Sequence, residues 1–242
     1  MQSVRMLDGY LVCATPRTGS TLLCGLLASS CVAGLPESYF RSQDEAMWAS
    51  RFGLSGTYDY LDFVRQAQRH GSTENGVFGA RVMWGTLDEV LYKIRPESPS
   101  GSELDLLRGV LGDLEFVYLW RGDALAQAVS WALAEESYVW HAPVNERRNA
   151  ARTAPAFDRE LVSNLLETID SHNRSWRDWF ASVGVQPCEV VYEDLDHDPP
   201  ATAARVLRSL GIDPPVTPLE VRFDRLRDEE NEQWIRRYRT GA

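Results

Sequence analysis

The first apolar run of the chain, Tyr10–Ala14, ends at a Thr-Pro break, which predicts a strand that enters a turn. A helix is predicted directly after the turn from apolar residues that recur at helical spacing, Leu22, Leu23, Leu26 and Leu27. Gly19 allows the backbone to approach a ligand closely, and the N–H groups of Gly19–Leu22 would point at an anion on the helix N-terminus. The pattern therefore predicts a strand, a phosphate-binding loop and a helix.

Apolar runs and helical patterns alternate along the rest of the chain. Further strands are predicted at residues 77–84, 115–120 and 189–192. Further helices are predicted at residues 44–51, 59–69, 87–94, 104–111, 124–136, 158–183 and 202–210. This alternation indicates a mostly parallel sheet with right-handed crossovers. We therefore expect an α/β, P-loop-like three-layer fold, with a mostly parallel central sheet flanked by helices and the ligand beyond the C-terminal ends of the strands.

The length and composition indicate one domain over residues 1–242, because 242 residues with 44% hydrophobic and 25% charged side chains can bury one sizeable core. The net charge of −10 argues against general nucleic-acid binding, which depends on phosphate neutralisation. An anionic ligand must therefore be met by local basic groups. One Arg-rich segment, residues 145–156, is expected to be exposed or to close over a charged group.

The expected location of the protein is the cytoplasm. The sequence contains no apolar run of membrane-spanning length and no signal-peptide pattern at its N-terminus. The cysteines lack metal-type spacing and are expected to be free thiols; they are Cys13, Cys24, Cys31 and Cys188.

The first loop departs from the usual P-loop at one position. The spacing from Ala14 through Gly19 to Thr21 is that of a P-loop, but Ser20 stands where the pattern has lysine. A loop that neutralises a phosphate without this lysine needs another cation, and Arg17 is the nearest candidate. The alternative is that the Gly-Ser-Thr sequence is only the N-cap of an apolar helix.

A second basic position, Arg121, directly follows the strand predicted at 115–120, and Ser130 lies nine positions later on the next helix. An arginine and a hydroxyl so placed can hold a second phosphate. A P-loop kinase or nucleotidase would instead need an aspartate after an apolar strand to hold Mg²⁺. Two anion sites without an evident metal ligand suggest a donor with phosphate groups at both ends of a nucleoside.

The loop Thr15–Thr21 resembles the 5′-phosphosulfate loop of sulfotransferases that use 3′-phosphoadenylyl sulfate, and Arg121 with Ser130 resembles their 3′-phosphate site. Other stretches are similar to the bacterial trehalose 2-sulfotransferase family, and the similarity runs over almost the entire chain. These stretches are Pro36–Tyr39, Gly79–Trp84, Trp120–Asp123 with Gln127–Ser130, and Val191–Leu195.

Two features depart from many cytosolic sulfotransferases. Arg17 stands where they carry lysine, and Arg121 and Ser130 are nine rather than eight positions apart. Arginine keeps the charge and presents a fork suited to phosphate or sulfonate oxygens. The additional residue can be absorbed in the Gly122-Asp123 turn.

The resemblance implies transfer of a sulfuryl group from 3′-phosphoadenylyl sulfate to a sugar hydroxyl, at the 2-position of trehalose or a related glycoside, without a metal. Glu37 would be the general base and Arg17 the electrophilic stabiliser. The residues implied to hold the donor are Pro16, Arg17, Thr18, Gly19, Ser20, Thr21, Leu22, Arg121 and Ser130. Adenosine 3′,5′-bisphosphate would be released, and the family resemblance also implies a homodimer.

Acceptor contacts are expected at four residues, Tyr39, Trp48, Arg81 and Trp84. Core packing is the alternative for the three aromatic residues, and a strand-end surface charge is the alternative for the arginine.

Other functions stay open from the residues alone. A small-molecule kinase or nucleotidase shares the loop-helix geometry, although Ser20 in place of lysine and the lack of a metal-binding acid disfavour it. A non-catalytic binding module is disfavoured by the intact Glu37 and Arg17. A sulfotransferase for a different glycoside, glycolipid or secondary metabolite would need only different side chains around the acceptor pocket.

Overall fold

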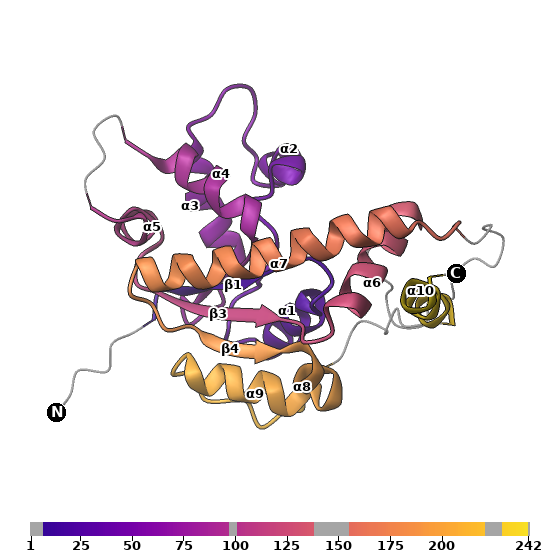
Figure 1. Cartoon of the computed structure of the whole chain (residues 1–242). Coiled ribbons are helices and arrows are strands. Elements are labelled where there is room, and N and C mark those ends of the chain that lie inside the picture. The colour runs from indigo at the N-terminus through magenta and orange to yellow at the C-terminus, as the bar shows by residue number, and fades with distance from the viewer. Residues whose placement is uncertain (1–6, 97–100, 138–154, 221–228, 242) are drawn as a thin grey trace.

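The centre of the computed structural model is a parallel sheet with the strand order β2-β1-β3-β4. Figure 1 shows β3 and β4 of this sheet side by side. The structure describes residues 7–96, 101–137, 155–220 and 229–241. The strands are β1 (Gly9–Ala14), β2 (Phe78–Met83), β3 (Leu114–Trp120) and β4 (Cys188–Val191). All four overlap the predicted strands, which confirms the mostly parallel α/β sheet. Every residue of β1 is buried, as expected for a parallel strand covered on both faces.

The helices before the longest one are α1 (Ser20–Ser29), α2 (Ser42–Arg51), α3 (Tyr60–Gly71), α4 (Trp84–Ile94), α5 (Glu103–Leu111) and α6 (Ala124–Ser137). The remaining helices are α7 (Arg159–Ser182), α8 (Tyr192–His197), α9 (Pro199–Ser209) and α10 (Glu229–Thr240). Several begin where an acidic side chain caps the first turn, such as Asp59 at α3 and Asp158 at α7. The starts predicted for these two helices, residues 59 and 158, are the cap residues themselves.

Three elements differ locally from the predictions. Trp84 was predicted to end a strand, but it opens α4, where its ring packs edge-on against Trp176 of α7. Helix α8 takes over at Tyr192, the residue predicted to end the fourth strand. Helix α10 is so polar that the sequence shows no clear helical repeat of apolar residues there. The helix is anchored mainly by the buried Trp234.

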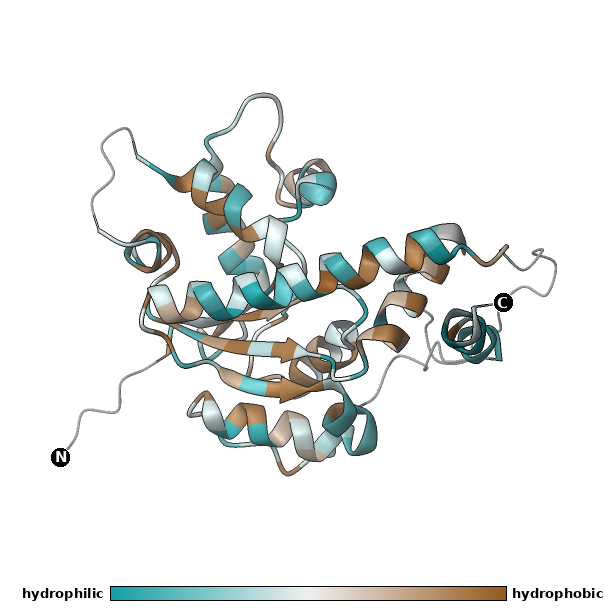
Figure 2. Ribbon diagram, viewed as in Figure 1, coloured by the Kyte–Doolittle hydropathy of each residue, from teal (hydrophilic) through white to brown (hydrophobic). Residues whose placement is uncertain are grey.

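Successive β1 side chains point to opposite faces of the sheet and enter different cores. Leu11 and Cys13 join the core formed with α3, α4, α5 and α7. Tyr10 and Val12 join the core formed with α1 and α9. Figures 1 and 2 show α7 and α9 on opposite sides of the strands, with apolar residues concentrated along β3 and β4. The result is a three-layer fold in which helices flank the central sheet.

A third core lies beyond the sheet, where α6, α7 and α10 pack together. It contains Val129 of α6, Ile169 of α7 and Trp234 of α10. Part of the C-terminal region is therefore packed against the helix that carries Ser130. The Arg-rich segment 145–156 falls almost entirely outside the described residues.

The four cysteines, Cys13, Cys24, Cys31 and Cys188, are all free, as predicted. Within the described ranges, none of the helices has both the length and the apolar character needed to cross a membrane.

Candidate functional site

The register of the sheet brings several loops to one edge. Ala14 at the end of β1 is paired with Met83 at the end of β2 and with Leu119 near the end of β3. Trp120 is paired with Val191 at the end of β4. Because the strands are parallel, the segments that follow them emerge on the same side. The first loop, the start of α4, Arg121 and the start of α8 therefore meet at this edge.

The first loop is held in its turn by buried hydrogen bonds. The Thr18 hydroxyl donates to the Thr15 carbonyl oxygen over 2.9 Å. The amide of Gln127, which is fully buried on α6, donates to Thr15 Oγ1 over 2.8 Å and to the Pro16 carbonyl oxygen over 2.7 Å. Helix α6 thus determines the shape of a loop more than a hundred residues earlier in the chain.

The N-terminus of α1 has the features of an anion site. Its N-cap, Gly19, has a left-handed backbone with φ +79°, no side chain caps the helix, and no acidic residue lies in its first turn. A helix N-terminus of this kind presents N–H groups and the positive end of the helix dipole. Ser20 is buried and Thr21 and Leu22 are half-buried, so a ligand here would be partly removed from water.

Three basic or hydroxyl side chains meet beside this loop. Arg17 Nε donates to Ser130 Oγ over 3.0 Å, and Arg121 Nη1 donates to the Arg17 carbonyl oxygen over 3.5 Å. Arg17 has φ +66°, which is unusual for a residue other than glycine. The two predicted anion sites are therefore adjacent, and Arg17 contacts the hydroxyl that was assigned to the second site.

Glu37 lies in a segment that pairs with β2. It forms an isolated parallel bridge with Ala80, and the Arg81 N–H donates to the Glu37 carbonyl oxygen over 2.9 Å. The residue is exposed. The Arg81 side chain donates from Nε to Ser38 Oγ over 2.9 Å and from Nη1 to Thr21 Oγ1 over 2.8 Å. Arg81 thus joins the Glu37 segment to the first turn of α1.

The aromatic acceptor candidates differ in burial. Tyr39 has no exposed surface, its hydroxyl donates to the Leu35 carbonyl oxygen over 2.6 Å, and burial raises its pKa. The Trp48 ring is 7% exposed and lies 4.8 Å from the Tyr39 ring, centroid to centroid. Both residues therefore occupy the core, as the alternative interpretation required. Trp84 is half-buried, with its ring 5.0 Å from that of Trp176.

Helix α8 contributes residues that sequence patterns alone did not identify. The guanidinium carbon of Arg121 lies 4.4 Å from the centroid of the Tyr192 ring. The Glu193 carboxylate accepts hydrogen bonds from the N–H groups of Gly122 and Asp123, over 3.0 and 3.1 Å. The only signal for these residues in the sequence was the Val191–Leu195 motif, because nothing in local periodicity indicates which loops α8 will contact.

Metal ligands were not expected from the sequence. Among the residues that the structure describes, no group of three or more His, Cys, Asp or Glu side chains could hold a metal ion. The expectation of a metal-free reaction stays a prediction.

Comparison with known proteins gives a match to the family model of the Stf0 sulphotransferases over residues 9–241. The trehalose 2-sulfotransferase of Mycolicibacterium smegmatis is 27% identical, with 96% of this chain and 95% of the relative covered. That of Mycobacterium tuberculosis is also 27% identical, with 98% and 97% covered. Among solved structures, the sulfotransferase domain of the Synechococcus PCC 7002 olefin synthase has a TM-score of 0.48 and 14% identity, covering 88% of this chain and 77% of that domain.

The close packing of the first loop predicts that Gly19→Ala destabilises the protein more than Gly53→Ala. Both glycines have positive φ, +79° and +74°, so an alanine at either position pays left-handed strain of about 1–2 kcal/mol. At Gly19 the new Cβ would also lie 2.8 Å from a ring carbon of Tyr192, whereas at Gly53 nothing lies within 4 Å. Overpacking should add about 1–3 kcal/mol at Gly19, measured by urea unfolding. Equal losses of unfolding free energy would contradict this.

Proposed function

We propose that this chain, which belongs to the Stf0 sulphotransferase family, transfers the sulfuryl group of 3′-phosphoadenylyl sulfate to a hydroxyl of a sugar. The enzyme class, sulfotransferase, follows from the family. The acceptor we propose is the 2-hydroxyl of trehalose or of a related glycoside, since both relatives described above are trehalose 2-sulfotransferases. One observation carries the site assignment: the segment of the exposed carboxylate Glu37 is joined through Arg81 to the first turn of α1, directly after the basic loop.

The donor is proposed to lie along the C-terminal edge of the sheet. Its 5′-phosphosulfate would rest on the loop and first turn Pro16–Leu22, where the helix N-terminus favours an anion. Its 3′-phosphate would contact Arg121 and Ser130. Arg17 would lie between the two phosphate groups of the donor, since it belongs to the loop and also contacts Ser130. The local arginines matter because the chain as a whole carries a net charge of −10.

In the proposed reaction, the acceptor oxygen forms a bond to sulfur while the bond between sulfur and the phosphate oxygen breaks. The Glu37 carboxylate takes the proton of the acceptor hydroxyl. Arg17 and the N–H groups at the start of α1 stabilise the negative charge that develops on the leaving phosphate oxygen. The products are a sulfated sugar and adenosine 3′,5′-bisphosphate. Catalysis then depends mainly on holding donor and acceptor in line.

The test is to incubate the purified chain with 3′-phosphoadenylyl ³⁵S-sulfate and a panel containing trehalose, other disaccharides and monosaccharides. The proposal expects a sulfated sugar, with the ester located by mass spectrometry, and trehalose among the best acceptors. A thermal-shift comparison of adenosine 3′,5′-bisphosphate with ATP-Mg²⁺ accompanies it, because a ligand that binds only the native state raises the melting temperature. Stabilisation by ATP-Mg²⁺ alone would favour the kinase alternative instead.

Arg121→Ala should weaken binding of adenosine 3′,5′-bisphosphate much more than binding of adenosine 5′-phosphate, because only the first ligand carries the phosphate assigned to Arg121 and Ser130. A lost charge-assisted bond of about 1.5–3 kcal/mol corresponds to about a 10–150-fold higher Kd in calorimetric titration. The exposed Arg69→Ala serves as the control and should leave both affinities unchanged. Equal losses for the two ligands would refute the assignment.

Glu37→Gln should lower kcat by about 10²–10⁴ while the affinity for adenosine 3′,5′-bisphosphate stays nearly unchanged. Glutamine keeps the size of the side chain and most of its hydrogen bonding but cannot accept the proton. Glu74→Gln, at another exposed glutamate, is the matched control and should retain full turnover. Near-normal turnover of Glu37→Gln would move the general base elsewhere.

Residues 1–242 are proposed to form one sulfotransferase domain that assembles as a homodimer, as the family resemblance implies. Light scattering at micromolar concentration and moderate salt should therefore give about twice the chain mass of 27.3 kDa. A mass equal to that of one chain would overturn the dimer. The cytoplasmic location stays a prediction.

A further inference from the structure

We infer that Arg81 is a positioning residue that fixes the distance between the Glu37 segment and the phosphate loop. The inference rests on the proposed function, in which Glu37 is the general base. It goes beyond that function because it assigns to Arg81 a role different from acceptor binding.

Arg81 contacts the Glu37 segment and the first turn of α1 through separate atoms. Its backbone N–H donates to the Glu37 carbonyl oxygen over 2.9 Å, and its Nε donates to Ser38 Oγ over the same distance. Its Nη1 donates to Thr21 Oγ1 over 2.8 Å. The planar fork of arginine can reach two hydroxyls in different directions, which the single ammonium of lysine does not reproduce. The partners are 43 and 60 residues away in the chain.

Arg81 is half-buried, and among the described residues its side chain makes hydrogen bonds to hydroxyls and no ion pair. Cys24 lies one turn beyond Thr21 on α1, and burial raises its pKa to about 12, with Arg81 opposing and Glu37 adding to that rise. Both charges are therefore close enough to α1 to act on the Cys24 thiol.

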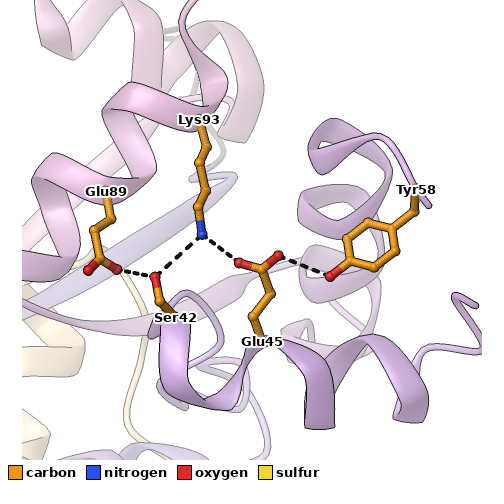
Figure 3. A network of polar contacts seen from close by, with 5 residues as sticks. All are labelled: Ser42, Glu45, Tyr58, Glu89 and Lys93. Atoms are coloured by element: carbon orange, nitrogen blue, oxygen red, sulfur yellow. Dashed lines mark hydrogen bonds and ion pairs between the residues drawn. The ribbon is translucent and has the colours of Figure 1, made fainter. Parts of the chain in front are cut away.

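The chain after Glu37 is also attached farther along, by an independent contact. Lys93 on α4 donates to Glu45 Oε2 on α2 over 2.6 Å and to Ser42 Oγ over 3.4 Å (Figure 3). In the same network Glu89 accepts from Ser42, and the Tyr58 hydroxyl donates to Glu45 over 3.0 Å. Helix α4 directly follows the strand that carries Arg81.

Two polar contacts therefore tie residues 37–45 to the β2–α4 unit, near Glu37 by Arg81 and farther away by Lys93. The rings of Tyr39 and Phe40 also pack against Phe78 of β2. Of the two polar contacts, only the first also reaches the phosphate loop, through Thr21. A proton acceptor must lie within about 2.6–3.2 Å of the acceptor hydroxyl while that oxygen is in line with the bond that breaks. A displacement of about 1 Å can cost about 10² in rate. Arg81 is placed to prevent such a displacement, whereas Lys93 is not.

The kinetic test compares Arg81→Met, Glu37→Gln and the double variant. Arg81→Met should lower kcat by about 10–10² and change the Kd of adenosine 3′,5′-bisphosphate by less than about threefold. Because Arg81 acts through Glu37, the double variant should be no more than about threefold slower than Glu37→Gln alone. If the two losses of kcat multiply in the double variant, Arg81 acts separately from Glu37. If Arg81→Met greatly weakens donor binding, Arg81 belongs to the phosphate site. Either result overturns the inference.

Two further variants separate positioning from general stability. Ser38→Ala removes one contact of Arg81 without removing the guanidinium, and it should lower kcat about 3–10-fold in the wild-type protein. Added to Arg81→Met, it should cause no further loss of kcat. Lys93→Met breaks the distant network and should leave kcat within about threefold of wild type. Arg81→Lys, which keeps the charge without the fork, should behave like Arg81→Met. Full activity of Arg81→Lys would contradict the need for the fork.

Hydrogen–deuterium exchange provides a readout that does not depend on turnover. Amides in residues 35–41 should exchange at least tenfold faster in Arg81→Met and Ser38→Ala than in wild type, whereas residues 60–71 of α3 should be unchanged. Unchanged exchange at 35–41 would refute the positioning role even if the enzyme were active. If instead no sugar is sulfated by the wild type but exchange rises as expected, the proposed function fails while the structural link stands.

Discussion

The parallel register of β1 with its two neighbours is the constraint on which the candidate site depends. Since Ala14 is level with both Met83 and Leu119, the segments that follow three strands must start from the same edge. Burial of β1 on both faces keeps this register, because a shift by one residue would turn its core side chains to the wrong side. The site is therefore held by the core of the sheet, although its loops lie at the surface.

The loop after β1 combines backbone conformations that are stable only because neighbouring elements hold them. Positive φ at Arg17 and Gly19 turns the chain sharply between strand and helix. The buried Gln127 amide donates to the Pro16 carbonyl oxygen, and the Trp176 indole donates to the Ala14 carbonyl oxygen over 3.1 Å, so both carbonyl groups just before this turn are satisfied. A loop fixed in this way can present N–H groups to an anion without reorganising, which is the condition for electrostatic stabilisation of a developing charge.

The first loop lacks the usual P-loop lysine, and two arginines lie at this loop instead. Arg17 lies within the loop and donates to Ser130, and Arg121, directly after β3, donates to the Arg17 carbonyl oxygen. Arginine suits these positions because its fork can bond to protein hydroxyls or carbonyls and still direct charge at phosphate oxygens. The protein is acidic overall, so a donor with several phosphate charges would be attracted by this local cluster.

The sequence alone determined the features that depend on neighbouring residues. Apolar spacing and capping residues predicted all four strands and most helices, and the Thr-Pro break with Gly19 predicted the loop, because these signals act over a few residues. The tertiary structure decided the contacts between distant segments. Arg17 meets Ser130 113 positions later, Arg81 meets Thr21 across 60 positions, and Tyr39 turns into the core. Such contacts follow from strand order, register and side-chain packing, and no local pattern contains that information.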